Sequence, residues 1–212
     1  MERREFAHIL AGVLVLFVVS SLFFVIKGNL GVVFWVFIFS FIIIGVHVFS
    51  KKIVAYLLDS NVEHRIWHVY QYGLRPKDHF KEEVPFGLIA PLFLSVLSAG
   101  ILKFTGVLTY ESRALKHRAA KRFGFYSFTE VTDWHNGLIG SCGIIAVLIL
   151  SVLGYSLDFE YLAKMAAYYA LSNMIPISNL DGTQIFFGSR IMWSVLALVS
   201  ALFAFAGFLI LV

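Results

Sequence analysis

The chain has 212 residues, of which 59% are hydrophobic and 14% are charged, whereas an ordinary soluble domain is about 45–50% apolar and about 25% charged. With a mean hydropathy of +0.84, this composition excludes a water-soluble globular domain. It predicts membrane-embedded helices, which satisfy their own backbone hydrogen bonds in lipid. Basic loops facing anionic lipid headgroups explain the formal net charge of +4, and no nucleic-acid-binding motif accompanies it.

Five continuous apolar segments are long enough to cross a bilayer core of about 30 Å as helices. They are Ala7–Ile26, Leu30–Leu58, Asn136–Leu157, Tyr161–Phe187 and Ile191–Val212. The first lacks a small-residue cleavage site, so we expect a retained helix rather than a signal peptide. The predicted fold is an all-α, multi-pass membrane protein with five or six transmembrane helices, forming a single membrane-embedded domain over residues 1–212.

Pro85–Leu108 is a sixth apolar candidate, but it contains two prolines, three glycines and Lys103. If this segment crosses the membrane, the lysines and arginines divide nine to eight between the two sides. If it enters and leaves on one face, that face holds fifteen of the seventeen, and only Lys27 and Lys164 lie opposite. The second arrangement obeys the positive-inside rule. We therefore expect a re-entrant or in-plane segment here, in a cell-membrane protein whose N-terminus is cytoplasmic.

Two polar stretches interrupt the apolar sequence. Val62–Tyr72 is rich in β-branched and aromatic residues, which predicts a short strand. Its two histidines, His64 and His68, would lie about 13 Å apart in a strand, too far for one metal ion. Tyr110–Phe123 sets five basic residues against apolar ones. It predicts either a basic amphipathic helix on the membrane surface or a solvated loop.

The stretch Asn173–Gly182 is polar although it lies in an apolar region, and it reads Asn-Met-Ile-Pro-Ile-Ser-Asn-Leu-Asp-Gly. Pro176 removes a backbone donor and Gly182 permits a turn, so we expect the helix to open here. Such an opening is tolerated in a membrane only where protein or a polar cavity satisfies the backbone. Asp181 is the only acidic residue after Glu160, and a carboxylate at membrane depth indicates a functional site.

The pattern Asn-x-x-Pro-x-x-x-Leu-Asp-Gly resembles the second motif of the site-2 protease family of intramembrane zinc metalloproteases, with a similar core over residues 30–188. The resemblance implies that Asp181 stands at a zinc ligand and that Asn173 holds the substrate or the open backbone. The family's first motif, His-Glu-x-x-His, supplies two histidine ligands and a glutamate general base. The matching place here reads His47-Val48-Phe49-Ser50-Lys51. Val48 therefore stands at the general-base position and Lys51 at the second histidine ligand.

These departures from the family's first motif predict that the chain does not cleave peptides. Val48 cannot accept a proton, and Lys51, one helical turn after His47, would repel a dication. His47 and Asp181 alone leave zinc without a third protein ligand. We expect Lys51 to take the metal's place and pair with Asp181, with no zinc bound.

The protein would then be a catalytically inactive homologue that lies in membrane lipid and binds transmembrane segments or partner proteins. Two alternatives stay open. One is an active zinc metalloprotease with a substituted first motif and an unrecognised third ligand, for which His135 is a candidate. The other is a transporter that uses Asp181 and Lys51 as a charge pair.

Overall fold

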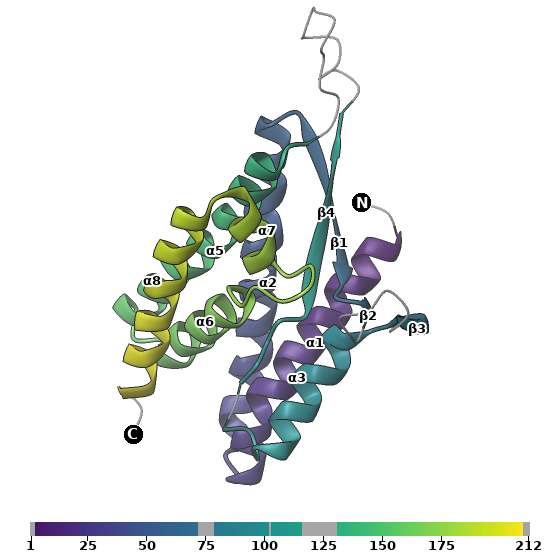
Figure 1. Cartoon of the computed structure of the whole chain (residues 1–212). Coiled ribbons are helices and arrows are strands. Elements are labelled where there is room, and N and C mark those ends of the chain that lie inside the picture. The colour runs from purple at the N-terminus through teal and green to yellow at the C-terminus, as the bar shows by residue number, and fades with distance from the viewer. Residues whose placement is uncertain (1–2, 72–78, 102, 116–130, 210–212) are drawn as a thin grey trace, which may run out of the picture.

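The computed structural model describes residues 3–71, 79–101, 103–115 and 131–209. The chain is mostly helical, with two small antiparallel sheets (Figure 1). The helices are α1 (Arg3–Ile26), α2 (Leu30–Leu57), α3 (Phe86–Leu97), α5 (Asp133–Ser156), α6 (Glu160–Asn173), α7 (Asp181–Gly188) and α8 (Arg190–Leu209). The strands are β1 (Ser60–Ile66), β2 (Val69–Gln71), β3 (His79–Val84) and β4 (Leu108–Ala114).

Among the described residues, four helices are long and apolar enough to cross a membrane, namely α1, α2, α5 and α8. This agrees with the prediction of a helical membrane protein. The apolar segment Tyr161–Phe187 is interrupted where the sequence predicts an opening, because α6 ends at Asn173 and α7 begins only at Asp181. Pro176 and the polar residues around it cause the interruption, since the proline cannot donate to the helical ladder. The total number of crossings stays a prediction.

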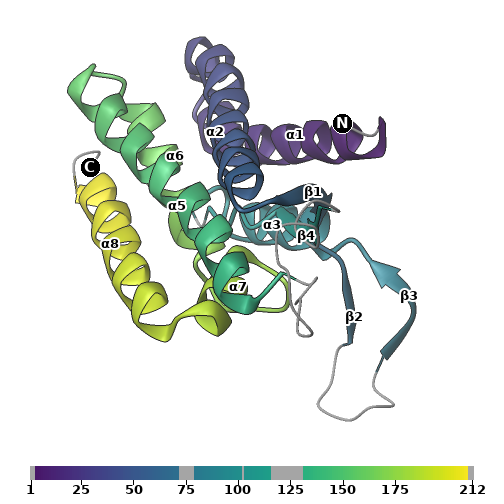
Figure 2. The ribbon, with the colours of Figure 1, turned by 90° about the horizontal axis from the view of Figure 1, so that it is seen from above.

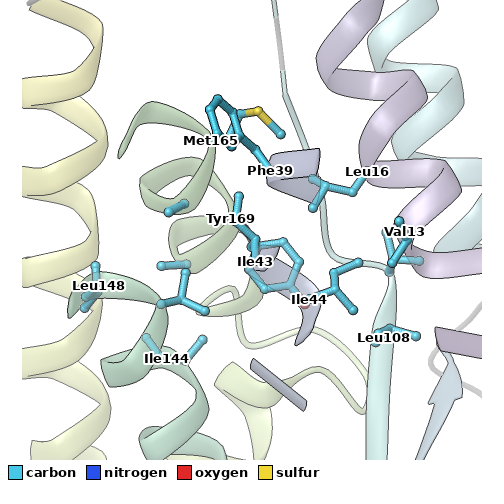
Figure 3. Close-up of a cluster of buried hydrophobic side chains, with 14 of the residues drawn as sticks. Val13, Leu16, Phe39, Ile43, Ile44, Leu108, Ile144, Leu148, Met165 and Tyr169 are labelled. Atoms are coloured by element: carbon cyan, nitrogen blue, oxygen red, sulfur yellow. The ribbon is translucent and has the colours of Figure 1, made fainter. Parts of the chain in front are cut away.

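The helix α2 lies between two groups of helices (Figure 2). On one side it packs against α5 and α6, with α8 behind them, and on the other side it packs against α1, which carries α3. Buried aliphatic and aromatic side chains from α1, α2, α5 and α6 fill the space around α2 (Figure 3). Ile43, Ile44 and Ile144 are fully buried at its centre.

The helices α2 and α6 run in the same direction, so the two sequence motifs arrive at the same place. The ring of Phe39, in the third turn of α2, lies 6.0 Å from the ring of Phe159, which precedes α6. Further along, the rings of His47 and Tyr169 lie 5.1 Å apart. The five-crossing arrangement requires this common direction, because it places both motifs at one side of the bundle.

The helix pair α6 and α7 covers the whole length of α5. At one end, a methyl group on Gly154 would come within 2.9 Å of the Ala163 backbone, so the helices touch closely there. At the other end, a methyl group on Gly137 would come within 3.1 Å of Gly188. The broken segment therefore runs from one end of the bundle to the other, although no single helix does so.

The segment Pro85–Leu108 forms an out-and-back hairpin beside α1. Its helix α3 has 12 residues, about 18 Å at 1.5 Å per residue, too short to cross a bilayer core. Gly100 turns the chain with a φ of 79° against the backbone of Phe23. Both ends of the hairpin bond to Trp67, whose carbonyl accepts from Gly87 and whose N–H donates to Val107, each at 2.8 Å. Both ends of the segment therefore lie beside Trp67, on the same side of the bundle. Whether the segment enters a membrane stays a prediction.

The observed strands differ from two elements predicted from the sequence. The predicted strand Val62–Tyr72 is divided into β1 and β2, and the buried Trp67 lies between them, where its N–H donates to Val107 in the register of β1 with β4. The predicted helix over Tyr110–Phe123 is wrong at its start, where β4 pairs antiparallel with β1 from Ser60↔Ala114 to Ile66↔Leu108. The first half of β4 is buried, from Leu108 to Tyr110, whereas Glu111 and Arg113 in its second half are exposed. Residues 116–123 lie outside the described part of the chain.

Candidate functional site

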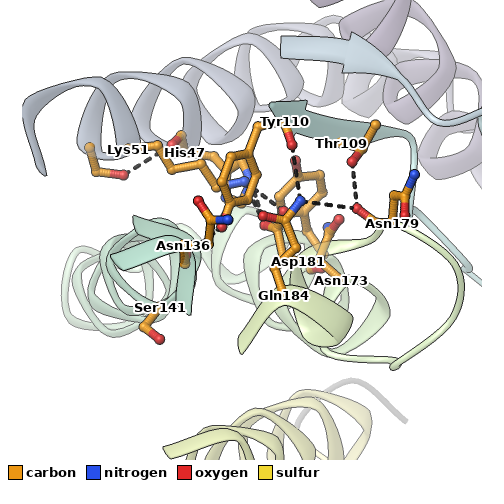
Figure 4. A network of polar contacts seen from close by, with 12 residues as sticks. His47, Lys51, Thr109, Tyr110, Asn136, Ser141, Asn173, Asn179, Asp181 and Gln184 are labelled. Atoms are coloured by element: carbon orange, nitrogen blue, oxygen red, sulfur yellow. Dashed lines mark hydrogen bonds and ion pairs between the residues drawn. The ribbon is translucent and has the colours of Figure 1, made fainter. Parts of the chain in front are cut away.

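Lys51 from α2 meets Asp181 from the first turn of α7 (Figure 4). The Nζ atom of Lys51 donates to both carboxylate oxygens, at 2.7 Å each. Both side chains are 0% exposed. The pair predicted from the sequence is therefore formed, and it closes a contact between residues 130 positions apart.

The helix break presents Asp181 to α2. A methyl group on Gly182 would come within 2.3 Å of the carbonyl oxygen of Met174, so only glycine fits where the chain folds back. Trp193 of α8 donates its indole N–H to that same carbonyl at 3.0 Å. Protein thus satisfies a backbone group that the break releases. Because Asp181 is in the first turn of α7, its negative charge also lies at the favourable end of the helix dipole.

His47 lies beside the ion pair, one helical turn before Lys51. Its Nε2 atom is 3.0 Å from Asp181 Oδ2, and both side chains are fully buried. The two groups are close in space but are not aligned as a hydrogen bond. Gly143 of α5 provides the space for this cluster, since a methyl group there would lie 2.6 Å from Lys51 Cε and 3.2 Å from His47 Cε1.

Tyr110 of β4 covers the other side of the lysine. The Nζ atom of Lys51 lies 4.3 Å from the centre of the Tyr110 ring, within the range of a cation–π contact. The Tyr110 hydroxyl donates to the carbonyl of Asn136 at 2.6 Å, which fixes the ring. The ammonium group is therefore held between a carboxylate and an aromatic face.

Sequence reasoning missed Tyr110, Tyr169 and Gly143 as parts of this site. The apolar Leu108 and Tyr110 alternate with polar Thr109 and Glu111 in the sequence, which was a usable signal for Tyr110, because such alternation indicates a strand rather than a helix. No local signal identifies Gly143, since its role depends on how closely α5 approaches α2. Tyr169 lies in an apolar helix, where nothing in the sequence distinguishes it from a packing residue.

Two further residues singled out by the resemblance are also buried. Val48 is 6% exposed and belongs to the apolar core. Asn173 is 0% exposed, and its side-chain amide donates to the carbonyl of Tyr169 at 2.9 Å. Its Oδ1 atom has no hydrogen-bond partner in the described part of the chain. A role for Asn173 in substrate binding stays a prediction.

The other histidines occupy separate places. In β1, His64 is fully buried, and its backbone N–H donates to Glu5 of α1 at 3.1 Å. Lys52 donates to the same carboxylate at 2.9 Å. Burial lowers the pKa of His64 to about 4. His68 Nδ1 lies 2.6 Å from the carbonyl of Ile66, and His135 contacts Thr132 at the start of α5.

The zinc ion that the resemblance implies does not fit these residues. His47 and Asp181 are the only matching donors, and Lys51 contacts both oxygens of the carboxylate. Across the described ranges, no three His, Cys, Asp or Glu side chains are grouped so that they could hold a metal ion. A catalytic zinc normally has three protein ligands and an open position.

A polar cavity of about 550 Å³ lies between β4, the start of α5 and α7, and Tyr110, whose ring contacts Lys51, is one of its lining residues. Gln184 of α7 donates to the carbonyl of Tyr110 at 2.9 Å, and Thr109 donates to the carbonyl of Asn179. These bonds tie the helix break to the edge of β4 that does not pair with β1. Other polar residues of the cavity are Ser112, Asn136, Ser178 and Thr183.

Comparison of the chain with known protein families, with curated proteins and with solved structures found no match. The fold and site define the chain as a helical protein that has, among its described residues, four helices able to cross a membrane and a buried Lys–Asp pair at a broken helix.

Proposed function

We propose that this chain is a site-2-protease-like membrane protein that binds transmembrane or extended segments of other membrane proteins without cleaving them. The observation that carries the proposal is the contact of Lys51 Nζ with both oxygens of Asp181 at 2.7 Å. Lys51 stands where the resemblance implies a metal ligand, and its charge already balances the carboxylate. On this proposal an ammonium group stands where the family places its metal ion.

The residues at these positions have no route to peptide hydrolysis by the family's chemistry. That chemistry needs a metal-activated water and a group that accepts its proton. Val48 has no acceptor, and it is buried in the apolar core. His47 and Asp181 provide two ligands where three are needed.

Binding of a segment is supported by the polar cavity beside the ion pair. The cavity runs along the edge of β4 that pairs with no other described strand, and an exposed strand edge accepts an extended peptide through backbone hydrogen bonds. The Tyr110 carbonyl already accepts from the side-chain amide of Gln184, an interaction that an incoming backbone N–H can replace. A membrane segment that unwinds beside the helix break would find polar partners there.

The same proposal assigns the protein to the cell membrane, with its N-terminus in the cytoplasm and the hairpin Pro85–Leu108 entering from that side. This orientation gathers fourteen of the seventeen lysines and arginines on the cytoplasmic face, because the structure places Lys103 beside Lys27 and Lys164 at the other end of the bundle. The cavity beside Asp181 then opens toward the cytoplasmic half of the membrane.

The test is to restore the missing groups. Val48→Glu and Lys51→His are introduced together, and cleavage of a panel of single-span reporter proteins is measured in membranes supplied with zinc. We expect cleavage by the double variant and none by the unaltered chain, with Asp181→Asn in the double variant as the inactive control. Cleavage by the unaltered chain would show a working protease. Cleavage by neither would remove the site-2-protease-like assignment and favour the transporter.

A further inference from the structure

Three lysines meet at the end of the bundle where α1 ends and where α2 and α6 begin. Lys27 follows α1, Lys103 lies on the returning leg of the hairpin, and Lys164 is in the second turn of α6. They line one cavity of about 390 Å³. Its other lining residues are Phe23, Phe24, Asn29, Tyr161 and Met165, none of which is acidic.

These positive charges are not balanced by carboxylates. In the part of the chain that the structure describes, none of the three lysines forms an ion pair. The Nζ atoms of Lys27 and Lys103 instead lie over the rings of Phe23 and Phe24, 4.4 and 5.5 Å from their centres. Ring faces compensate a charge only in part. Lys103 is half-buried, and placing a cation away from water without an anion is costly.

This arrangement disfavours the charged form of Lys103. Burial, and then the nearby charge of Lys164, lower the pKa of Lys103 to about 8. An anion in the cavity would oppose both effects, because it would supply the missing opposite charge to each ammonium group. The cavity therefore has positive charge that an anionic ligand would balance.

We propose that this cavity binds a phosphate-bearing anion. Three ammonium groups supply up to nine N–H donors as flexible point charges, and phosphate oxygens accept from such donors. The aromatic side chains give the cavity an apolar floor, which suits the glycerol or acyl part of a lipid. This inference is independent of the proposed function, since none of these residues belongs to the Lys51–Asp181 site.

A lipid headgroup and free phosphate share this chemistry, and the surroundings favour the lipid. Lys164 also lines a second, mainly apolar cavity of about 410 Å³ between α5, α6 and α8. That cavity contains one carboxylate, Glu160, among side chains such as Val152, Leu202 and Phe203. A lipid whose phosphate is held by the three lysines would therefore have an apolar cavity nearby for its acyl chain.

The experiment uses the full chain, purified in a neutral detergent and stripped of lipid. Its unfolding temperature is followed while dioctanoyl phosphatidylglycerol or inorganic phosphate is added, separately and in competition. We expect a saturable rise, with half-saturation at about fivefold to tenfold higher concentration for Lys103→Gln. Lys81→Gln, which removes an exposed lysine from β3, is the matched control and should bind like the unaltered chain.

Competition between the two added ligands distinguishes a lipid headgroup from free phosphate. Saturation by phosphatidylglycerol, with phosphate as a weak competitor, would support a lipid headgroup. Saturation by phosphate that the lipid does not displace would support a free anion at the same site. If neither raises the unfolding temperature, or if Lys103→Gln binds as tightly as Lys81→Gln, the proposal is overturned. Should Lys103→Gln fail to fold, the double variant Lys27→Gln with Lys164→Gln provides the same comparison.

Discussion

Lys51 Nζ lies 2.7 Å from each carboxylate oxygen of Asp181, and both side chains are completely enclosed by protein. A buried ion pair gains little over a well-packed apolar pair, but removal of one partner leaves an uncompensated charge. The two residues are therefore coupled, and each is required because the other is present.

This coupling predicts the outcome of a double-mutant cycle. Lys51→Met should lower the free energy of unfolding by about 3–5 kcal/mol, because it leaves the Asp181 carboxylate buried and unpaired. Lys51→Met combined with Asp181→Leu should recover much of that loss. Denaturant titration in detergent, followed by tryptophan fluorescence, measures each variant. Equal stability of Lys51→Met and the unaltered chain would show that the pair is not formed.

Gly143 should be required for the same cluster. Gly143→Ala should destabilise the protein by about 1–3 kcal/mol, because the added methyl group would lie 2.6 Å from Lys51 Cε. Gly45→Ala is the matched control, since Gly45 is an exposed glycine of α2 with open space around it. That variant should be neutral or gain up to about 1 kcal/mol from the lower flexibility of alanine. Equal effects of the two substitutions would contradict the packing described for Gly143.

The stability of the protein should fall in acid because of His64. Its pKa is about 4 in the folded chain, against an ordinary value of about 6.5. The folded state thus disfavours the protonated ring, so stability is greatest above pH 6.5 and declines as the pH falls toward 4, by up to about 3 kcal/mol.

His64→Gln should flatten this decline, while Lys52 continues to pair with Glu5. His68→Gln, on the neighbouring turn, is the control and should keep the original pH dependence. Unfolding temperatures between pH 7.5 and pH 4.5 provide the comparison. An unchanged slope in His64→Gln would remove His64 as the cause.

The sequence contained enough information for the centre of the site but not for its surroundings. A carboxylate in an apolar region needs a cation, and Lys51 was the basic residue matched to the ligand position, so the pair could be predicted. Pro176 and Gly182 indicated the helix break, although the apolar residues on both sides suggested one continuous span.

Other features depend on contacts between distant segments. The basic residues after Tyr110 suggested a surface helix or a solvated loop, whereas pairing with β1 makes the described part, up to Ala114, a strand. The hairpin is held by Trp67, which lies outside it in the sequence. Gly143 matters only because α5 approaches α2 closely. Hydropathy and short motifs carry no information about these distances.

The central claim is that Lys51 replaces a metal ion at Asp181, and zinc content tests it most directly. Zinc per chain is measured by mass spectrometry of the purified, unaltered protein and of the variant carrying Val48→Glu and Lys51→His, after both are dialysed against the same zinc buffer. We predict zinc well below one ion per chain in the unaltered protein and close to one in the variant. One tightly held zinc ion per unaltered chain, lost on Asp181→Asn, would contradict the claim.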